Sequence, residues 1–355
     1  DLPGLDRLVQ QLQDILELRE IPPGERPPIL TSCASEGRGV AEAASGRNAG
    51  FLLAGIAENY VAASRRYGEA KALRIWDVTR RTQSLVRSLV AEHGIDCELR
   101  WNGSDQIAAD DLEWSEIDES ARRLGAHGIR VTLDQGARAA TYHDAGELHP
   151  IRWVRGLASA AARAGARIHE DTVVTGAAGG LARTAGGTVR AGAVLLCTNA
   201  YTAHLLPTRV RPVRGQMLAT APITPVFARP AYANRGYQYW RQTADGRVVV
   251  GGWRDTAAAR EVGEDEAPTR EIQAHLDAFL RERGITAPVT HRWAGTMGFS
   301  HDALPYVGHA GARLFVCGGF TGHGMAFGPA CAEMVAAMIR GTSHPDADLF
   351  DPLRA

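Results

Sequence analysis

One stretch near the C-terminal end of the chain constrains the fold more than any other. The apolar residues 314–317 are typical of a strand, and they run into a turn that holds four glycines, Gly318, Gly319, Gly322 and Gly324. A helix that includes 329–339 follows. Glycines between a strand and a helix let backbone N–H groups approach a ligand, and the helix start adds partial positive charge. The stretch predicts an α/β layer with a flat, polar-edged or anionic ligand at this turn. A turn that is glycine-rich only to close tightly is the alternative.

Composition excludes several classes of function. A chain of 355 residues suits two domains. It carries 39 basic and 40 acidic groups, which leaves no electrostatic footprint for nucleic acid or an anionic membrane. No apolar run reaches the roughly 20 residues of a membrane span, and no signal-peptide pattern is found, so we expect a cytoplasmic protein. The five cysteines are far apart and form no CxxC pair, so we predict neither a disulfide framework nor a metal site.

Hydrophobic periodicity predicts secondary structure along the chain. Helical spacing predicts helices at 1–20, 69–93, 110–127, 150–164 and 269–283. Extended patterns predict strands at 29–35, 98–108, 166–174, 193–197, 211–221 and 289–297, and hairpins at 177–190 and 237–252. Residues 257–268 read as a mobile acidic loop. Helix–strand segments and antiparallel strands interleave, which favours a mixed α/β fold of two discontinuous domains.

Seven segments carry a resemblance to a known family. They are ASGRNAG (44–50), HPIRWVRGLASAAARAGARIHEDTVV (149–174), AVLLCTNAYTAHLLP (193–207), RPVRGQM (211–217), DGRVVVGG (245–252), WAGTMGFSHDALPYVG (293–308) and FVCGGFTGHGMAFGP (315–329). In this order and spacing they resemble the FAD-dependent D-amino acid oxidase, glycine oxidase and sarcosine oxidase family, especially its γ-glutamylputrescine oxidase-like branch. Seven ordered segments are far more specific than one glycine motif.

The resemblance implies a fold and a reaction. An FAD/NAD(P)-binding, Rossmann-like domain would comprise residues 1–76, 148–210 and 300–355. A substrate domain built on an antiparallel sheet would comprise 77–147 and 211–299. FAD would accept a hydride at N5 from the carbon beside the nitrogen of a small amine or amino acid, and water would hydrolyse the resulting imine. O2 or another electron acceptor would reoxidise the flavin.

The resemblance also implies the residues that meet FAD. Glu36 would hold the adenosine ribose, and Val174 would present backbone to the adenine. Residues beside the isoalloxazine would be Ser45, Gly46, Arg47 and Asn48. Residues near the ribitol and pyrophosphate would be Thr198, Asn199 and Ala200. Residues that close on the flavin pyrimidine, with N–H groups aimed at N1 and O2, would be Gly318, Gly319, Thr321, Gly322, His323, Gly324 and Met325.

The candidate catalytic residues are Arg47, Asn48, Tyr239 and His323, and several of these have simpler explanations. His323 could be a solvent-facing turn histidine, and Arg47 could belong to a surface ion pair. Tyr239 could serve sheet packing, which is the commoner reason for an alternating aromatic residue. Two further arginines, Arg241 and Arg254, could grip a carboxylate or be ordinary solvated strand charges.

One expected motif is absent from the sequence. The family's first strand ends in GxGxxG, whose amides cradle the pyrophosphate. The corresponding positions hold Gln13, Ile15 and Leu18. Three explanations stay open: the true N-terminal segment is missing or altered, FAD is held by the remaining contacts, or the chain is a flavin-free family member that acts as a scaffold or partner subunit.

Overall fold

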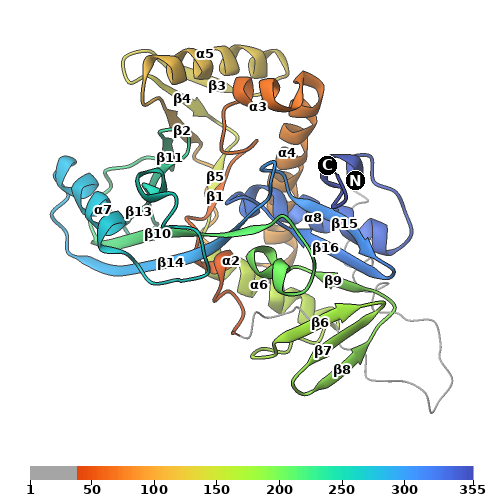
Figure 1. Ribbon diagram of the computed structural model, residues 1–355. Coiled ribbons are helices and arrows are strands. Elements are labelled where there is room, and N and C mark those ends of the chain that lie inside the picture. The colour runs from red at the N-terminus through yellow and green to blue at the C-terminus, as the bar shows by residue number, and fades with distance from the viewer. Residues whose placement is uncertain (1–37, 355) are drawn as a thin grey trace.

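The computed structural model describes residues 38–354, and Figure 1 shows how its elements are arranged. The helices are α2 (Ala44–Arg47), α3 (Tyr60–Tyr67), α4 (Glu69–His93), α5 (Asp111–Ala126), α6 (Pro150–Arg163), α7 (Arg270–Glu282) and α8 (Gly324–Ile339). Short 3₁₀ helices are η1 (Asn199–His204), η2 (Arg254–Ala257) and η3 (Ala347–Phe350). The predictions for 1–20, 29–35 and Glu36 lie outside the described residues.

The strands fall into separate sheets. Those of the large sheet are β2 (Ser104–Ile107), β3 (Val131–Asp134), β4 (Ala139–Tyr142), β10 (Arg211–Pro222), β11 (Ala231–Ala233), β12 (Gln238–Gln242), β13 (Arg247–Gly252) and β14 (Val289–Phe299). The other strands are β1 (Phe51–Leu52), β5 (Gly146–Glu147), β6 (Val174–Ala178), β7 (Leu181–Thr184), β8 (Gly187–Arg190), β9 (Val194–Leu196), β15 (Tyr306–Gly311) and β16 (Leu314–Gly318).

The large sheet has the strand order β14-β10-β13-β12-β11-β2-β4-β3. Its neighbours pair antiparallel, except for β11 and β2, which run parallel. Helix α7 covers one face, where Leu218, Trp240 and Val250 pack with Leu276 and Phe279 (Figure 1). We call this the α7 face, and we call the opposite face the site face. Because strand side chains alternate, neighbouring residues such as Tyr239 and Trp240 point to different faces.

A second layer contains the glycine-rich stretch. Strand β16 runs parallel to β9 and antiparallel to β15. Helix α8 follows β16 directly and packs against α4 through a core that includes Ile75, Phe327 and Met334. The helix begins at Gly324, which is five residues earlier than Pro329. The glycine turn is therefore short, and its last glycine is already helical.

Several other predictions can be compared with the structure. The helix predicted at 69–93 is α4, which ends at Gly94 with the positive φ of 61° that favours glycine at this position. The strand predicted at 166–174 is wrong, because β6 begins only at Val174. Strand β6 pairs with the β7–β8 hairpin in a sheet at one corner of the molecule (Figure 1). Within 38–354, no helix is both long and apolar enough to cross a membrane.

Candidate active site

The glycine turn between β16 and α8 is shaped by two neighbouring segments. From η1, the side-chain oxygen of Asn199 accepts hydrogen bonds from the N–H groups of Gly319 (2.9 Å) and Phe320 (3.2 Å). From β14, the carbonyl of Gly298 accepts the N–H of Thr321 at 2.7 Å. Gly319 has a φ of 71°, and a Cβ there would lie 3.1 Å from the ring of Tyr306. The turn is therefore fixed in one shape, and Asn199 acts as its cap.

Backbone donors at this turn are free. Among residues 38–354, the N–H groups of Gly322, Gly324 and Met325 have no hydrogen-bond acceptor. Gly324 and Met325 are the first two residues of α8, so their N–H groups cannot pair within the helix. The helix start carries partial positive charge as well. A ligand edge with acceptor atoms or developing negative charge would satisfy these donors.

His323 lies in the middle of this turn and is held in one tautomer. Its Nδ1 is 3.3 Å from the carbonyl oxygen of Thr321, which can only accept, so Nδ1 carries the proton. Nε2 therefore holds a lone pair, and this atom is buried without a partner in the described part of the chain. Burial lowers the pKa of His323, so the ring is neutral at pH 7. The solvent-facing alternative is wrong.

Aromatic side chains stand beside His323. The ring of Tyr232 is 6.2 Å from the imidazole and 5.7 Å from the ring of Tyr239. Phe51 of β1 meets both tyrosines edge-on, at 5.4 and 6.3 Å. Burial raises the pKa of Tyr239 to about 12 and raises that of Tyr232 further, so both phenols are neutral. Tyr232 and Phe51 were not among the predicted residues.

Glycines leave space on the site face of the large sheet. A Cβ at Gly251 would lie 2.7 Å from Cζ of Tyr239, and one at Gly215 would lie 2.9 Å from Cε of Met297. On β14, a Cβ at Gly295 would lie 3.2 Å from Cβ of Arg47. Larger side chains lie directly over these positions, most closely at Gly251. The absence of side chains at these glycines therefore leaves room for the side chains that lie over the site face.

The stretch around Arg47 is also tightly built. A Cβ at Gly46 would overlap the carbonyl oxygen of Ala41, so only glycine fits there. The Asn48 side chain is fully used locally: its amide donates to the carbonyl of Ser45 at 2.7 Å, and its oxygen accepts the N–H of Gly50 at 2.8 Å. Ser45 itself is exposed. Arg47 donates to the Ala294 carbonyl of β14 at 3.0 Å.

Strand β14 brings most of the predicted residues together. Arg47 contacts it at Ala294, while the glycine turn contacts it at Met297 and Gly298, three or four residues further along. Residues 198–200 join the same region, because a Cβ at Gly298 would lie 2.8 Å from the N of Ala200. Thr198 lies behind them, with its hydroxyl 3.0 Å from that of Thr202. Val174 is not in this group, since it begins β6 in a different sheet.

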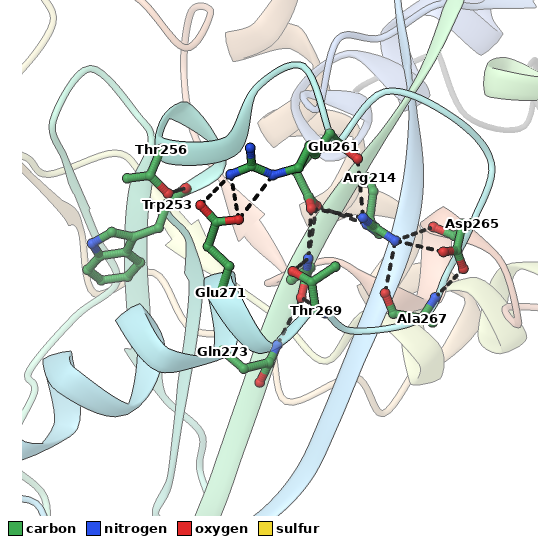
Figure 2. Close-up of polar contacts among 11 residues, drawn as sticks. Arg214, Trp253, Thr256, Glu261, Asp265, Ala267, Thr269, Glu271 and Gln273 are labelled. Carbon is green, nitrogen blue, oxygen red and sulfur yellow. Dashed lines mark hydrogen bonds and ion pairs between the residues drawn. The ribbon is translucent and has the colours of Figure 1, made fainter.

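The prediction of a mobile acidic loop at 257–268 is wrong. Glu261 is 2% exposed and accepts two hydrogen bonds of 2.9 Å from the guanidinium of Arg214 on β10 (Figure 2). Gln216 donates to the same carboxylate, and Asp265 binds the Arg214 Nη1 at 3.0 Å. The loop is therefore pinned to the sheet by buried charge.

The same loop supplies Glu266, a site residue that sequence reasoning missed. Its carboxylate accepts hydrogen bonds from Arg38 (2.5 Å), Arg47 (2.7 Å) and the hydroxyl of Tyr201 (3.2 Å). Arg47 is thus part of an ion pair, which was the alternative to a catalytic role. The partner, however, is a largely buried carboxylate rather than a surface one. No local sequence signal marks Glu266, because its partners are distant in sequence.

The fold and the site together define a class of protein. In this class, the glycine turn of an α/β unit faces an antiparallel sheet, and aromatic side chains lie between the two. A model of the family described as DAO, FAD dependent oxidoreductase, matches residues 34–338. The chain therefore belongs to the DAO family of FAD dependent oxidoreductases, and it is an oxidoreductase with FAD as its cofactor. The predicted family, enzyme class and cofactor are confirmed.

Individual relatives agree with this assignment. Gamma-glutamylputrescine oxidoreductase of Escherichia coli (strain K12) is 26% identical over 336 residues, which cover 87% of this chain and 76% of that protein. Glycine oxidase of Geobacillus kaustophilus (strain HTA426) is 30% identical over 208 residues, which cover 52% and 51% of the two chains. The crystal structure of glycine oxidase from Geobacillus kaustophilus superposes with a TM-score of 0.74 at 22% identity and covers 90% and 91% of the chains. The mixed α/β, Rossmann-like fold is confirmed.

The described residues fit one end of a flavin. The free N–H groups at the start of α8 and the unpartnered Nε2 of His323 suit the acceptor atoms of a pyrimidine edge and a reacting group beside it. The positions expected to hold the pyrophosphate (Gln13, Ile15 and Leu18) and the ribose (Glu36) lie outside the described residues. The described residues can therefore be compared only with the redox end of FAD, and they fit it.

Proposed function

We propose that the protein oxidises the C–N bond of a small amine or amino acid and releases an imine that water hydrolyses to a carbonyl compound. The observation that carries this proposal is His323, whose buried lone pair has no partner and lies beside the free N–H groups at the start of α8. Gamma-glutamylputrescine oxidoreductase and glycine oxidase, to which the chain is similar, are named for substrates of this class.

The redox end of the cofactor would lie between two segments of the chain. One is the glycine turn with the start of α8, and the other is the stretch around Arg47. When bound, FAD supplies the two-electron oxidation by accepting a hydride at N5 from the carbon beside the nitrogen. The N–H groups of Gly322, Gly324 and Met325 would stabilise negative charge at the pyrimidine edge. Ser45, Gly46 and the Arg47 backbone would border the other side. Acceptors of electrons from the reduced cofactor would be O2 or another oxidant.

His323 would hold the amine in its reactive form. A nitrogen lone pair assists loss of hydride from the neighbouring carbon, so the amine must be neutral and correctly oriented. The Nε2 lone pair of His323 accepts an N–H from the amine, and the hydrogen bond from Nδ1–H to the Thr321 carbonyl keeps that lone pair in place. Tyr239 and Tyr232 close the space beside it and exclude water.

Arg47 and Asn48 have a different part in this proposal. Glu266 already neutralises Arg47, and the polar atoms of Asn48 are engaged with its own turn. We therefore assign both residues to the stretch that borders the cofactor, and we assign neither of them to substrate binding. The distribution of strands supports a division into an FAD unit (1–76, 148–210 and 300–355) and a substrate unit (77–147 and 211–299), because every strand of the large sheet comes from the second set.

The experiment is an anaerobic titration of the purified, FAD-loaded protein with a panel of amines and amino acids. We expect one group of compounds to bleach the flavin absorbance and to yield the matching aldehyde or keto acid. His323→Asn should slow bleaching by about 100-fold, as expected when the group that orients the reacting amine is lost, and should retain FAD. The control His127→Asn alters an exposed histidine at the end of α5. A loaded protein that no amine bleaches, or a protein that takes up no FAD, would overturn the proposal.

A further inference from the structure

A second charged group faces the site, the guanidinium of Arg254. Its central carbon lies 5.0 Å from the ring centroid of Tyr237 and 4.8 Å from that of Phe299. Phe299 belongs to the site face, since it alternates with Met297 on β14, and Tyr237 is the turn residue directly before β12. The positive charge of Arg254 is also close enough to Tyr239 to oppose the rise in the pKa of that phenol.

Arg254 differs from Arg47, Arg214 and Arg241 because its donors are open. Arg47 is paired with Glu266, Arg214 with Glu261, and Arg241 with Glu147 at 3.2 Å. Within residues 38–354, no carboxylate lies within ion-pair distance of Arg254, and no atom accepts a hydrogen bond from it. The aromatic rings attract its charge but leave its planar set of N–H donors available to a ligand.

The backbone before Arg254 is bent so that this side chain lies over the sheet. Gly252 has a φ of 115°, and a Cβ there would lie 2.9 Å from the carbonyl carbon of Tyr237. Trp253 has a φ of 59°, a conformation that is unfavourable for a residue with a side chain. Its N–H donates to the Tyr237 carbonyl at 2.6 Å. The chain thus reverses at the end of β13 and carries Arg254 back across Tyr237.

The segment after the bend is held as firmly. The hydroxyl of Thr256 donates to the Trp253 carbonyl at 2.8 Å, and Asp255 accepts from the Asn234 amide at 3.1 Å. Further along, the Glu261–Arg214 pair anchors the loop (Figure 2). Arg254 is therefore pre-organised, so that a ligand binding to it would not have to order the loop.

We propose that Arg254 binds a carboxylate of the substrate, which makes the substrate an amine whose other end carries a carboxylate. This inference rests on the proposed function, in which the amine lies at His323. Tyr232 and Tyr239 connect the two ends and suit an apolar spacer. The planar guanidinium matches a carboxylate with two parallel hydrogen bonds, which a lysine could not make.

The first test measures carboxylate binding to the FAD-loaded protein by isothermal titration calorimetry, with benzoate and 4-phenylbutanoate as probes. Arg254→Met should weaken binding by about tenfold or more, the size of a lost charge-assisted pair. Arg254→Lys should lie between the two. The matched control is Arg260→Met, which removes an exposed arginine of the same loop that is paired with Glu271. Benzamide, which is uncharged, should bind all four proteins alike.

The second test compares amine pairs that differ only in the carboxylate, such as 4-aminobutanoate with butylamine and 5-aminopentanoate with pentylamine. Arg254→Met should raise KM for the amino acids, leave kcat nearly unchanged, and leave kcat/KM for the alkylamines unaltered. Equal losses for both members of a pair would overturn the assignment of Arg254.

Failures of the two proposals can be told apart. If the wild-type protein oxidises neither member of any pair, the proposed function fails, while the benzoate titration still decides the role of Arg254. Wild-type protein that binds neither probe, or Arg254→Met that binds them as tightly as wild type, would overturn the inference. Circular dichroism checks folding, and Arg254→Lys provides the decision if Arg254→Met does not fold.

Discussion

The two faces of the large sheet belong to the same strands but carry very different side chains. On the α7 face, Trp240 and Val250 fill a close-packed core with α7. One residue away on each strand, Tyr239 and Gly251 face the site, where a glycine lies beneath an aromatic ring. Because side chains alternate along a strand, a residue that stabilises the core and a residue that faces the site can be neighbours in the sequence. The α7 face also pins the loop that supplies Arg254 and Glu266.

The largest effect should come from the pinned loop. Glu261→Ala leaves the guanidinium of Arg214 buried without its main partner, so we expect the free energy of unfolding to fall by about 3–5 kcal/mol. Urea denaturation followed by circular dichroism measures the change. The control Glu264→Ala removes an exposed carboxylate that contacts His204, and it should cost under about 1 kcal/mol. Equal losses in the two variants would contradict the contrast between buried and exposed pairs.

A smaller effect should come from filling the site face. In Gly251→Ala the added Cβ would meet the ring of Tyr239, so we expect a loss of about 1–3 kcal/mol and a displaced ring. Thermal unfolding measures the loss, and substrate titration measures the damage to the site. The double variant Gly251→Ala with Tyr239→Ala should regain part of the stability. If the single variant is neutral in both assays, the site face is not as closely fitted as we describe.

The smallest effect concerns pH and His323. Its folded-state pKa lies below the ordinary value, so below about pH 6.5 the unfolded chain binds a proton that the folded protein refuses. Stability should therefore fall as pH drops from 7.5 to 5.5, by at most about 1.4 kcal/mol per pH unit from this group. His323→Gln should remove that part of the slope in urea titrations at both pH values. His127→Gln should leave the slope as it is, and an unchanged slope in His323→Gln would contradict a buried neutral ring.

Local signals explain what could be predicted from the sequence. The helix at 69–93 was predicted with its observed ends, because its apolar period continues for many turns and Gly94 stops it. The β12–β13 hairpin followed from Asp245-Gly246, where Gly246 has a φ of 89°. The segment 166–174 has an extended pattern as well, yet among the described strands it contributes only Val174, the first residue of β6.

Residues that depend on distant partners could not be predicted. Glu266 meets Arg47 across 219 positions and Arg38 across 228, and nothing in the loop sequence points to either. In the sequence, Tyr232 has the pattern of an ordinary strand residue, and only the fold places His323 beside it. The glycine turn was predicted because its chemistry is contained within a few residues. Its cap, Asn199, was predicted as a contact of the cofactor, and its hold on the turn became visible only in the structure.

The position of β14 at the border of the large sheet has a consequence for self-association. An unpaired border strand offers its peptide groups to any neighbouring molecule and invites fibrous growth. Here the Ala294 and Gly298 carbonyls are bonded to Arg47 and Thr321 of the same chain. The machinery that would grip the cofactor thus also shields the sheet from intermolecular strand addition, so loosening the glycine turn would be expected to cost solubility as well as activity.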